Sequence, residues 1–374
     1  GGLAVFAADA LSSTAYGTEE IIRALVPAGP AGLAWSVPIG SAVVALLVVV
    51  VISYRQTVVE YPSGGGAYVV ARDNLGITPS LVAGAALQSS YVLTVSVSVA
   101  AGVAAITSAW PALYDHRVAI GVVWIAFMAL VNLRGVRESA AVFGVPVYAF
   151  VALMLALVVV GLGRLLFGAL EPVTAAEQLV ATRQFTGAGM LFLVLRAFSS
   201  GGATLTGVEA VANGVPAFSQ PSGPNAARVL GILAILLGSM FFGTTLLLHA
   251  THILPSEQET MLSQLTAVVF GRGVLYYALQ IATAIILVIA ANTSFAGFPR
   301  LAAFMGEDGF VPRQFANLGD RLVYSNGIVF LAVLASLLLA VFGGVVTLLI
   351  PLYAVGVFTA FTASQAGMVV HWQR

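Results

Sequence analysis

The sequence predicts an all-α integral membrane protein, a bundle of ten transmembrane helices. Of its 374 residues, 60% are hydrophobic and only 8% are charged, whereas a soluble domain carries about 25% charged residues. The mean hydropathy of +1.02 agrees, because a single soluble core could not enclose so much apolar sequence. The formal net charge is zero, so the basic footprint of a nucleic-acid-binding protein is missing. We therefore expect membrane lipid as a partner and no nucleic acid.

Ten segments approach the length of about 20 mostly apolar residues that a membrane-spanning helix needs. The longer connections between them, at 54–78, 168–187, 253–272 and 299–325, hold most of the charged residues. Residues 1–374 are therefore expected to form a single transmembrane domain with both ends on the same side. The ten segments are 3–26, 33–53, 79–109, 118–133, 143–167, 188–214, 228–252, 273–298, 326–343 and 345–370.

The Arg residues predict the orientation of this bundle, because positive residues accumulate in cytoplasmic connections. With a cytoplasmic N-terminus, nine Arg residues lie inside and five outside, and Arg196 falls within a span. The sequence thus favours a cytoplasmic N-terminus. The inside set is Arg55, Arg72, Arg134, Arg137, Arg228, Arg300, Arg313, Arg321 and Arg374.

The first and sixth spans differ from plain apolar helices. The first carries ADALSSTAYG (8–17) and the sixth carries FSSGGATLTGVE (198–209), and each holds one acid, Asp9 or Glu209. If the ten helices form two five-helix repeats, approximately 1–167 and 188–370, these spans occupy corresponding positions. Paired interrupted segments of this kind indicate a transporter binding site. Small residues also serve close helix packing, so a membrane scaffold or sensor without transport is an alternative.

Asp9 and Glu209 are the central candidates for function. An ionised carboxylate at the centre of the membrane costs roughly 2.5–3.5 kcal/mol, and a cation, a proton or an Arg would offset this cost. Arg196 lies thirteen residues before Glu209, about 20 Å along a helix, so the two are not expected to pair. Either acid is a candidate to exchange a proton. If both acids simply lined an open pore, the protein would be a channel.

Hydroxyl groups accompany these acids. Thr206 stands three residues before Glu209 and would share a helical face with it, which suits a hard cation that binds oxygen ligands. In the third span, Tyr91, Thr94 and Ser98 recur at spacings of three and four, so they share a face that should point into the bundle. The alternative for each hydroxyl is a hydrogen bond to helix backbone.

Other features give no sign of an enzyme or of a bound cofactor. The chain has no Cys, which excludes disulfides and thiolate metal sites, and no arrangement of Ser, His and Asp indicates a hydrolase. The glycines at 64–66 lack the Gly-Lys-Ser/Thr ending of a phosphate-binding loop. We expect them to form a flexible cytoplasmic turn.

Five stretches carry a family resemblance: ADALSSTAYGTEE (8–20), YPSGGGAY (61–68), YVLTVSVSVAAGVAAIT (91–107), TLTGVEAVANGVP (204–216) and ANTSFAGFP (291–299). They resemble the amino acid–polyamine–organocation superfamily, and more closely its KimA-type potassium–proton symporters of the KUP group. The resemblance runs nearly end to end. It implies the LeuT-like fold, with five helices followed by five inverted ones and with helices 1 and 6 broken.

The resemblance also assigns roles to individual residues. It implies that Glu209 is the proton-coupling acid, a role for which Asp9 is a second candidate. The KimA-type proteins carry an Asp immediately before the helix-three Tyr, where this sequence has Ser90. The implied cation-binding or gating residues are Asp9, Tyr16, Ser90, Tyr91, Thr94, Ser98, Thr206 and Tyr353, with a potassium ion held by Tyr91, Thr94, Thr206 and Glu209.

The resemblance leaves two substrates open. One acid fewer at Ser90 weakens the attraction for a desolvated cation, which favours an amino acid permease on the same scaffold. Against this, Ser12-Ser13-Thr14 stands where many amino acid carriers have a Gly-Ser-Gly break. We therefore expect a proton-coupled symporter that imports potassium across the bacterial plasma membrane by alternating access, with an amino acid permease as the alternative. Larger family members continue past helix ten, where this sequence ends, into a region that supports dimers, so a homodimer is one implied oligomeric state.

Overall fold

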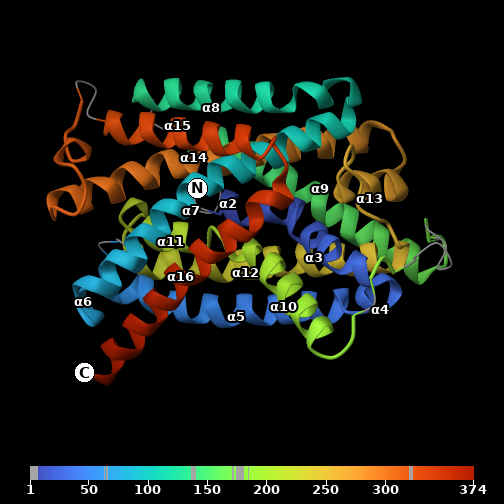
Figure 1. The fold of residues 1–374 in the computed structure, drawn as a ribbon, viewed down its shortest axis with the longest axis horizontal. Helices are drawn as coiled ribbons and strands as arrows, with labels where there is room; N and C mark the ends of the chain where they lie inside the picture. The colour runs from blue at the N-terminus through green and yellow to red at the C-terminus, as the bar shows by residue number, and fades with distance from the viewer. Residues whose placement is uncertain are drawn as a thin grey trace.

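The computed structural model describes residues 7–62, 64, 66–135, 140–170, 172–173, 181–183, 185–319 and 323–374, without the side chains of 140–142. Every regular element in these residues is helical, as predicted, and the long helices run roughly along one axis (Figure 1). Arg137, Arg321, Gly65 and the first residues of the predicted span 3–26 lie outside the described residues.

The helices follow the predicted spans closely, with short additional helices in several connections. They are α2 Ala8–Ser12, α3 Gly17–Leu25, α4 Gly29–Leu33, α5 Ser36–Glu60, α6 Gly66–Leu75, α7 Ile77–Ala109, α8 Arg117–Leu133, α9 Ala140–Leu166, α10 Ala188–Gly202, α11 Val208–Asn213, α12 Ser222–Thr251, α13 Met261–Phe270, α14 Val274–Glu307, α15 Ser325–Val341 and α16 Val346–Gln373.

Eight helical segments of the described chain are long and apolar enough to cross a membrane. The segment α15 is apolar but has only 17 residues, and the first predicted span is divided between α2 and α3. Large apolar side chains cover the outer faces of the helices, among them Val123, Ile235 and Val355. Such a surface requires lipid around it. The protein is therefore a multi-pass membrane protein.

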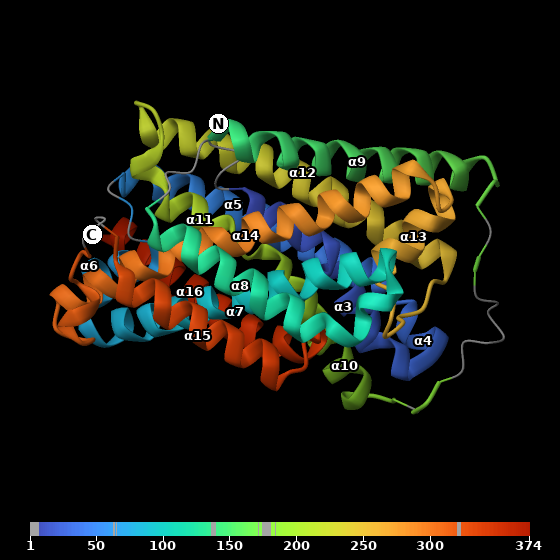
Figure 2. The same ribbon diagram turned by 90° about the horizontal axis from the view of Figure 1, so that it is seen from above.

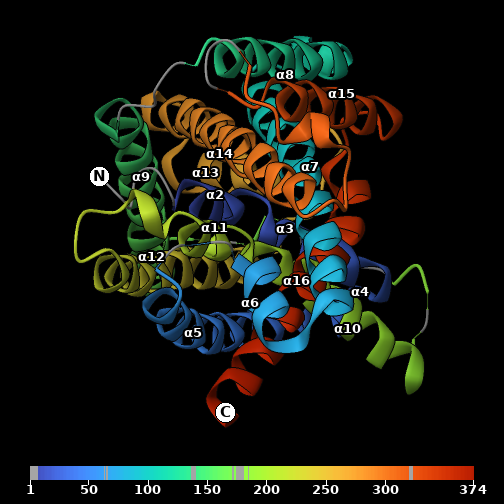
Figure 3. The same cartoon turned by 90° about the vertical axis from the view of Figure 1, so that its left-hand side faces the viewer.

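The short helices α2, α3 and α11 lie at the centre of the bundle. In the view along the long helices, α5, α12, α9, α14, α7 and α16 surround them, while α8 and α15 pack on one outer side (Figure 3). The helix α7 packs along both α14 and α16, and α5 packs along α12. The interrupted segments are thus shielded from lipid by continuous helices, which allows backbone groups to leave regular hydrogen bonding at membrane depth.

Two ten-residue helices lie at opposite ends of the bundle. The helix α6 connects α5 with α7, and α13 connects α12 with α14 (Figures 1 and 2). At the α6 end, the Tyr68 hydroxyl and the Arg72 guanidinium both donate to Asp308 Oδ2, at 2.6 and 2.5 Å. Burial and this hydrogen bond to Asp308 raise the pKa of Tyr68 to about 12. The contact therefore holds α6 against the end of α14.

Candidate functional site

The first and sixth spans are both interrupted by a short 3₁₀ turn, at Ser13–Ala15 and Ala203–Leu205. Their hydroxyl side chains explain these interruptions. Thr14 Oγ1 donates to the Leu11 carbonyl and Thr204 Oγ1 donates to the Gly201 carbonyl, each at 2.7 Å. A side chain that bonds the carbonyl three residues earlier competes with the regular helical hydrogen bond and favours the tighter turn.

The two interruptions pack directly against each other through glycines. Gly207 has a φ of +82°, and a methyl group there would lie 2.3 Å from the Ala10 nitrogen. A methyl group on Gly17 would lie 1.8 Å from the Thr204 methyl carbon. The backbones of the two broken spans can therefore approach closely only because both positions are glycine.

A buried cavity of about 40 Å³ lies beside this contact. Most of its polar wall comes from α2, α7, α16 and the interruption before α11. A water molecule occupies about 30 Å³ of liquid, so the cavity has room for only one or two particles of that size. The wall consists of Asp9, Leu87, Ser90, Tyr91, Thr94, Thr206, Gly207, Glu209, Ala210, Asn213, Tyr353, Val357 and Phe361.

Several oxygen atoms in this wall lack a protein partner. Within the described residues no hydrogen bond or ion pair reaches the carboxylate of Asp9, although its side chain is buried. The Ser90 and Thr206 hydroxyl oxygens are buried without a hydrogen bond of regular geometry. The Tyr16 and Tyr353 hydroxyls lie near that of Thr206. Buried polar groups are rarely left unpaired, so this set of oxygens has the capacity to bind a ligand.

The remaining polar groups of the wall are paired with one another. Thr94 Oγ1 and the Tyr353 hydroxyl are 2.8 Å apart, and the Asn213 amide donates to the Tyr91 hydroxyl at 3.0 Å. These bonds fix the orientation of two tyrosine hydroxyls at the cavity. A fixed oxygen can replace part of the hydration shell of an ion with little reorganisation.

Glu209 lies at the α6 end of the cavity. Its Oε1 accepts a hydrogen bond from the Ala67 backbone N–H at 3.1 Å. No positively charged side chain of the described residues forms a salt bridge with it. The carboxyl group is therefore held by a neutral donor in the first turn of α6, a position where a helix favours negative charge.

Seven of the nine predicted site residues line the cavity: Asp9, Ser90, Tyr91, Thr94, Thr206, Glu209 and Tyr353. The other two, Tyr16 and Ser98, are buried but do not belong to its wall. The predicted helical face shared by Thr206 and Glu209 is wrong, because α11 begins only at Val208 and Thr206 has extended backbone angles. The two residues meet at the cavity through the turn at Gly207.

The sequence reasoning missed Asn213 and the loop at 64–66. Asn213 stands four residues after Glu209, a helical spacing that places both on one face of α11, so the signal was present. The glycines were predicted to form a flexible turn, whereas Gly64 and Gly66 pack against Asn213. A methyl group on Gly66 would lie 2.0 Å from Oδ1 of Asn213. These glycines therefore allow α6 to reach α11.

A second, wider cavity of about 460 Å³ lies at the α13 end; we call it the vestibule. Its wall includes Tyr16, Glu19, Glu20, Arg23 and the segment 256–260. Because Tyr16 borders the vestibule and lies near Thr206 of the small cavity, it stands between the two spaces. Tyr16 is thus placed as part of the partition between them.

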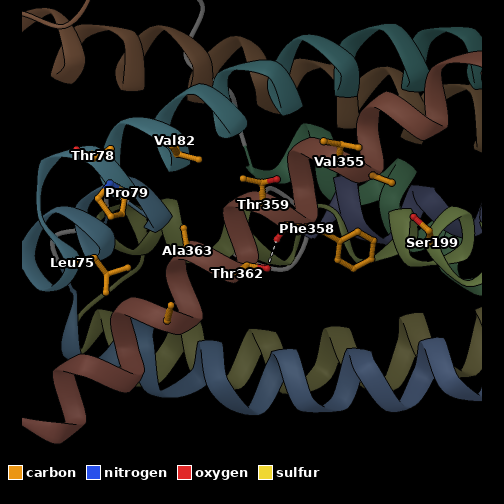
Figure 4. Close-up of a pocket in the computed structure, with 12 residues that line it drawn as sticks. Leu75, Thr78, Pro79, Val82, Ser199, Val355, Phe358, Thr359, Thr362 and Ala363 are labelled. Atoms are coloured by element: carbon orange, nitrogen blue, oxygen red, sulfur yellow. Dashed lines mark hydrogen bonds between the residues drawn. The ribbon is translucent and has the colours of Figure 1, made fainter. Parts of the chain in front are cut away.

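A third cavity, of about 700 Å³, has a different character. It is an open groove between the start of α7, one side of α16 and the end of α10, lined by Leu75, Pro79, Val82, Val355 and Phe358 among others (Figure 4). Among its hydroxyls, that of Thr362 donates to the Phe358 carbonyl at 2.7 Å. The groove is open, mostly apolar and without a charged side chain in its wall, so the small cavity is the candidate site.

The long apolar helices and the oxygen-lined cavity define a multi-pass membrane protein with a candidate site for a small polar ligand. The amino acid permease family model matches residues 3–374, and the chain belongs to that family. It is 47% identical over 371 residues to the potassium transporter KimA of Bacillus subtilis (strain 168). This alignment covers 99% of this chain and 60% of that protein. It is 25% identical over 277 residues to the low-affinity putrescine importer PlaP of Escherichia coli (strain K12), covering 71% of this chain and 57% of that protein.

The chain thus spans about 60% of the length of the curated relatives it matches. These comparisons confirm the resemblance that the sequence stretches suggested, both to the superfamily and to the KimA-type transporters.

Proposed function

We propose that this protein is a proton-coupled symporter that imports potassium across the bacterial plasma membrane by alternating access. The observation that carries the proposal is the cavity of about 40 Å³, where among the described residues the Asp9 carboxylate has no hydrogen bond or ion pair and the Ser90 hydroxyl has no hydrogen bond. Oxygen ligands of this kind suit a hard monovalent cation. The similarity to a potassium transporter supports the same substrate.

The size of the cavity favours an inorganic ion over an organic substrate. Pockets for organic ligands usually have about 300–1,000 Å³, several times the volume of this cavity. An amino acid or a diamine such as putrescine would require the wall residues to move apart. A potassium ion with at most one water would not. The amino acid permease alternative is therefore the weaker one, despite the missing acid at Ser90.

The surroundings of Glu209 support its role as the proton-coupling acid. A carboxylate without a counter-charge at membrane depth is costly, and either a proton or a cation in the cavity removes that cost. Glu209 borders the cavity and has only the neutral Ala67 N–H as a hydrogen-bond donor among the described residues. Proton uptake and cation binding would then be linked through one carboxyl group.

We further propose the LeuT-like arrangement, with repeat one at about 1–167 and repeat two at about 188–370. In this reading α2 and α3 together form the first crossing, α10 and α11 form the sixth, and α15 is the ninth, which brings the number of crossings to ten. The Arg-rich α6 end faces the cytoplasm, and the vestibule opens to the outside. Alternating access would move the two interrupted spans against the surrounding helices.

The test is uptake of potassium or rubidium into proteoliposomes that contain the full chain, with and without an inward proton gradient. We expect uptake that increases with the gradient and falls strongly in Asp9→Asn. Uptake of labelled amino acids or putrescine without cation flux would overturn the potassium proposal. Electrical currents far above the turnover of a carrier would instead identify a channel.

A further inference from the structure

The interruptions of the first and sixth spans repeat one motif, Thr-x-x-Gly-x-Glu. In the first span it runs from Thr14 through Gly17 to Glu19, and in the sixth from Thr204 through Gly207 to Glu209. The local structure repeats as well. The 3₁₀ turns are Ser13–Ala15 and Ala203–Leu205, and the two Thr hydroxyls bond the carbonyl three residues earlier at the same distance of 2.7 Å.

The glutamates at the ends of the two motifs make matching contacts. Glu209 accepts from the Ala67 N–H in the first turn of α6, at 3.1 Å. Glu19 accepts from the Met261 N–H in the first turn of α13, at 2.9 Å. Each glutamate is thus bound by the ten-residue helix of the other half of the chain, and these helices lie at opposite ends of the bundle (Figure 1).

We propose that Glu19 is the positioning residue that closes the vestibule side of the transport path, as the counterpart of Glu209 on the α6 side. We call the Glu19–Met261 hydrogen bond the outer clamp and the Glu209–Ala67 hydrogen bond the inner clamp. The outer clamp fixes α3 to α13 and keeps Tyr16 between the vestibule and the cavity. This inference rests on the transport function proposed above.

The surroundings of Glu19 fit a clamp. Its carboxylate also accepts from Arg23 Nε and Nη2 at 2.9 and 2.7 Å, and Arg23 donates further to the Ser256 carbonyl at 2.6 Å. Ser256 belongs to the segment that leads into α13. Glu19 therefore joins α3 to α13 directly through Met261 and indirectly through Arg23, and it lines the vestibule that the clamp would close.

Both clamps are formed in this structure. The small cavity is bordered by Glu209 on the α6 side, and Tyr16 lies between it and the vestibule. Access from either side then requires that one clamp opens while the other stays closed. Weakening one clamp should shift the population toward the state that is open on its side.

The absence of Cys allows a direct test, because a single introduced thiol has no background. Ala101 is buried at the wall of the vestibule, so Ala101→Cys reports access from that side to a membrane-impermeant maleimide. In this background we expect Glu19→Gln to raise the labelling rate about tenfold, because a charge-assisted hydrogen bond is replaced by a weaker neutral one. Glu209→Gln should lower the labelling rate.

A backbone variant separates the clamp from the charge of Glu19. Met261 is the first residue of α13, where a helix tolerates Pro. The change to Pro removes the backbone N–H as well as the Met side chain. The preceding Thr260 has φ −66° and ψ 150°, the conformation required before Pro. Met261→Pro should raise labelling as Glu19→Gln does. Met261→Ala loses the same side chain but keeps the N–H, and Glu257→Gln removes an exposed acid of the vestibule; both should label like the parent.

The outcomes distinguish this inference from the proposed function. Faster labelling in both Glu19→Gln and Met261→Pro, with both controls unchanged, supports the outer clamp. Unchanged labelling in these two variants, while Glu209→Gln still lowers it, overturns the outer clamp but leaves the transport cycle intact. If Met261→Ala labels as fast as Met261→Pro, side-chain packing explains the effect and the clamp is overturned.

Discussion

Glu19 and Glu209 have matching neighbours in the sequence and different neighbours in space. Each follows a glycine by two residues and accepts a backbone N–H from the first turn of a short helix. Glu19 additionally accepts two hydrogen bonds from Arg23, whereas no salt bridge to Glu209 occurs among the described residues. Charges interact strongly where water is excluded, so the Arg23 guanidinium is a counter-charge that partly offsets the cost of a buried carboxylate at Glu19. Glu209 has no such counter-charge among the described residues, which is why we propose it as the proton-coupling acid.

The same local motif therefore occurs in two different electrostatic surroundings. At the α13 end the ion pair makes the contact a fixed electrostatic one. At the α6 end the Glu209 carboxyl group borders the small cavity, together with Asp9. The placement of one Arg therefore separates a structural acid from a candidate coupling acid.

The largest effect is expected for Gly207→Ala compared with Gly17→Ala. Gly207 combines a positive φ with backbone atoms of Ala10 in the path of a methyl group, so the change should destabilise the fold by more than about 3 kcal/mol. At Gly17 the obstructing atoms belong to side chains, the Thr204 methyl carbon at 1.8 Å and a Phe241 ring carbon at 3.2 Å, and about 1–2 kcal/mol is expected. Thermal unfolding of the purified protein measures both.

A rescue variant sharpens this comparison. Thr204→Ser removes the obstructing methyl group and keeps the hydroxyl that bonds Gly201, so it should restore most of the stability of Gly17→Ala. It should not help Gly207→Ala. Equal unfolding temperatures for the two single glycine variants would contradict the different surroundings of the two interruptions.

The next largest effect is expected in gradient-driven uptake. Glu209→Gln cannot take up a proton and should reduce cation uptake driven by a pH gradient by about 100-fold, equivalent to about 2.7 kcal/mol. Glu19→Gln should slow uptake but preserve its dependence on the gradient, because Glu19 does not border the small cavity. The ratio of uptake with and without the gradient measures the difference. Loss of that ratio in Glu19→Gln alone would reverse the assignment of the two acids.

A smaller effect is expected when charge is added to the cavity wall. Ser90→Asp adds a second carboxylate to the cavity wall that contains Asp9. The added negative charge should attract the cation and lower the KM for potassium about tenfold. The Ser90 hydroxyl already lies close to Gly356, so the larger side chain would extend into the small cavity that Ser90 lines. Ser90→Asn has the same shape without the charge and serves as the control. An equal KM for both variants would show that charge at this position does not matter.

The smallest effect is expected at the Tyr68–Asp308 contact that anchors α6. Tyr68→Phe should cost about 1 kcal/mol of stability through the lost hydrogen bond. The pKa of Tyr68, raised to about 12, lies above its ordinary value of about 10. The stabilisation is therefore complete below about pH 10 and lost as the pH rises through about 12. The free energies of unfolding of Tyr68→Phe and of the parent should therefore differ below about pH 10, and this difference should shrink only in the alkaline range.

Much of the fold followed from local patterns. The apolar segments predicted the helices because each needs about 20 such residues to cross lipid. The helix α12 begins six residues before its predicted span (222 against 228), and α14 ends nine residues after its own (307 against 298). The Gly, Ser and Thr clusters predicted where the first and sixth spans are interrupted. These are local effects of side-chain hydroxyls and glycine, and one sequence suffices to find them.

The site was less predictable because it is made by contacts between distant residues. Asn213, Ala67 and Glu19 act through partners that lie 122, 142 and 242 residues away in the chain. The backbone N–H of Ala67 has no signature in a side-chain pattern. Thr206 was assigned to a helical face that does not exist, since Gly207 turns the chain before α11 begins.

The sequence alone determined that this is a helical membrane protein, where its two spans are interrupted and which acids lie within them, because hydropathy and hydroxyl or glycine clusters act over a few residues. The tertiary structure alone decided which acid has a counter-charge, how small the cavity is and which short helix binds each glutamate. Those properties depend on the distances between helices that are far apart in the chain, and no local pattern encodes such distances.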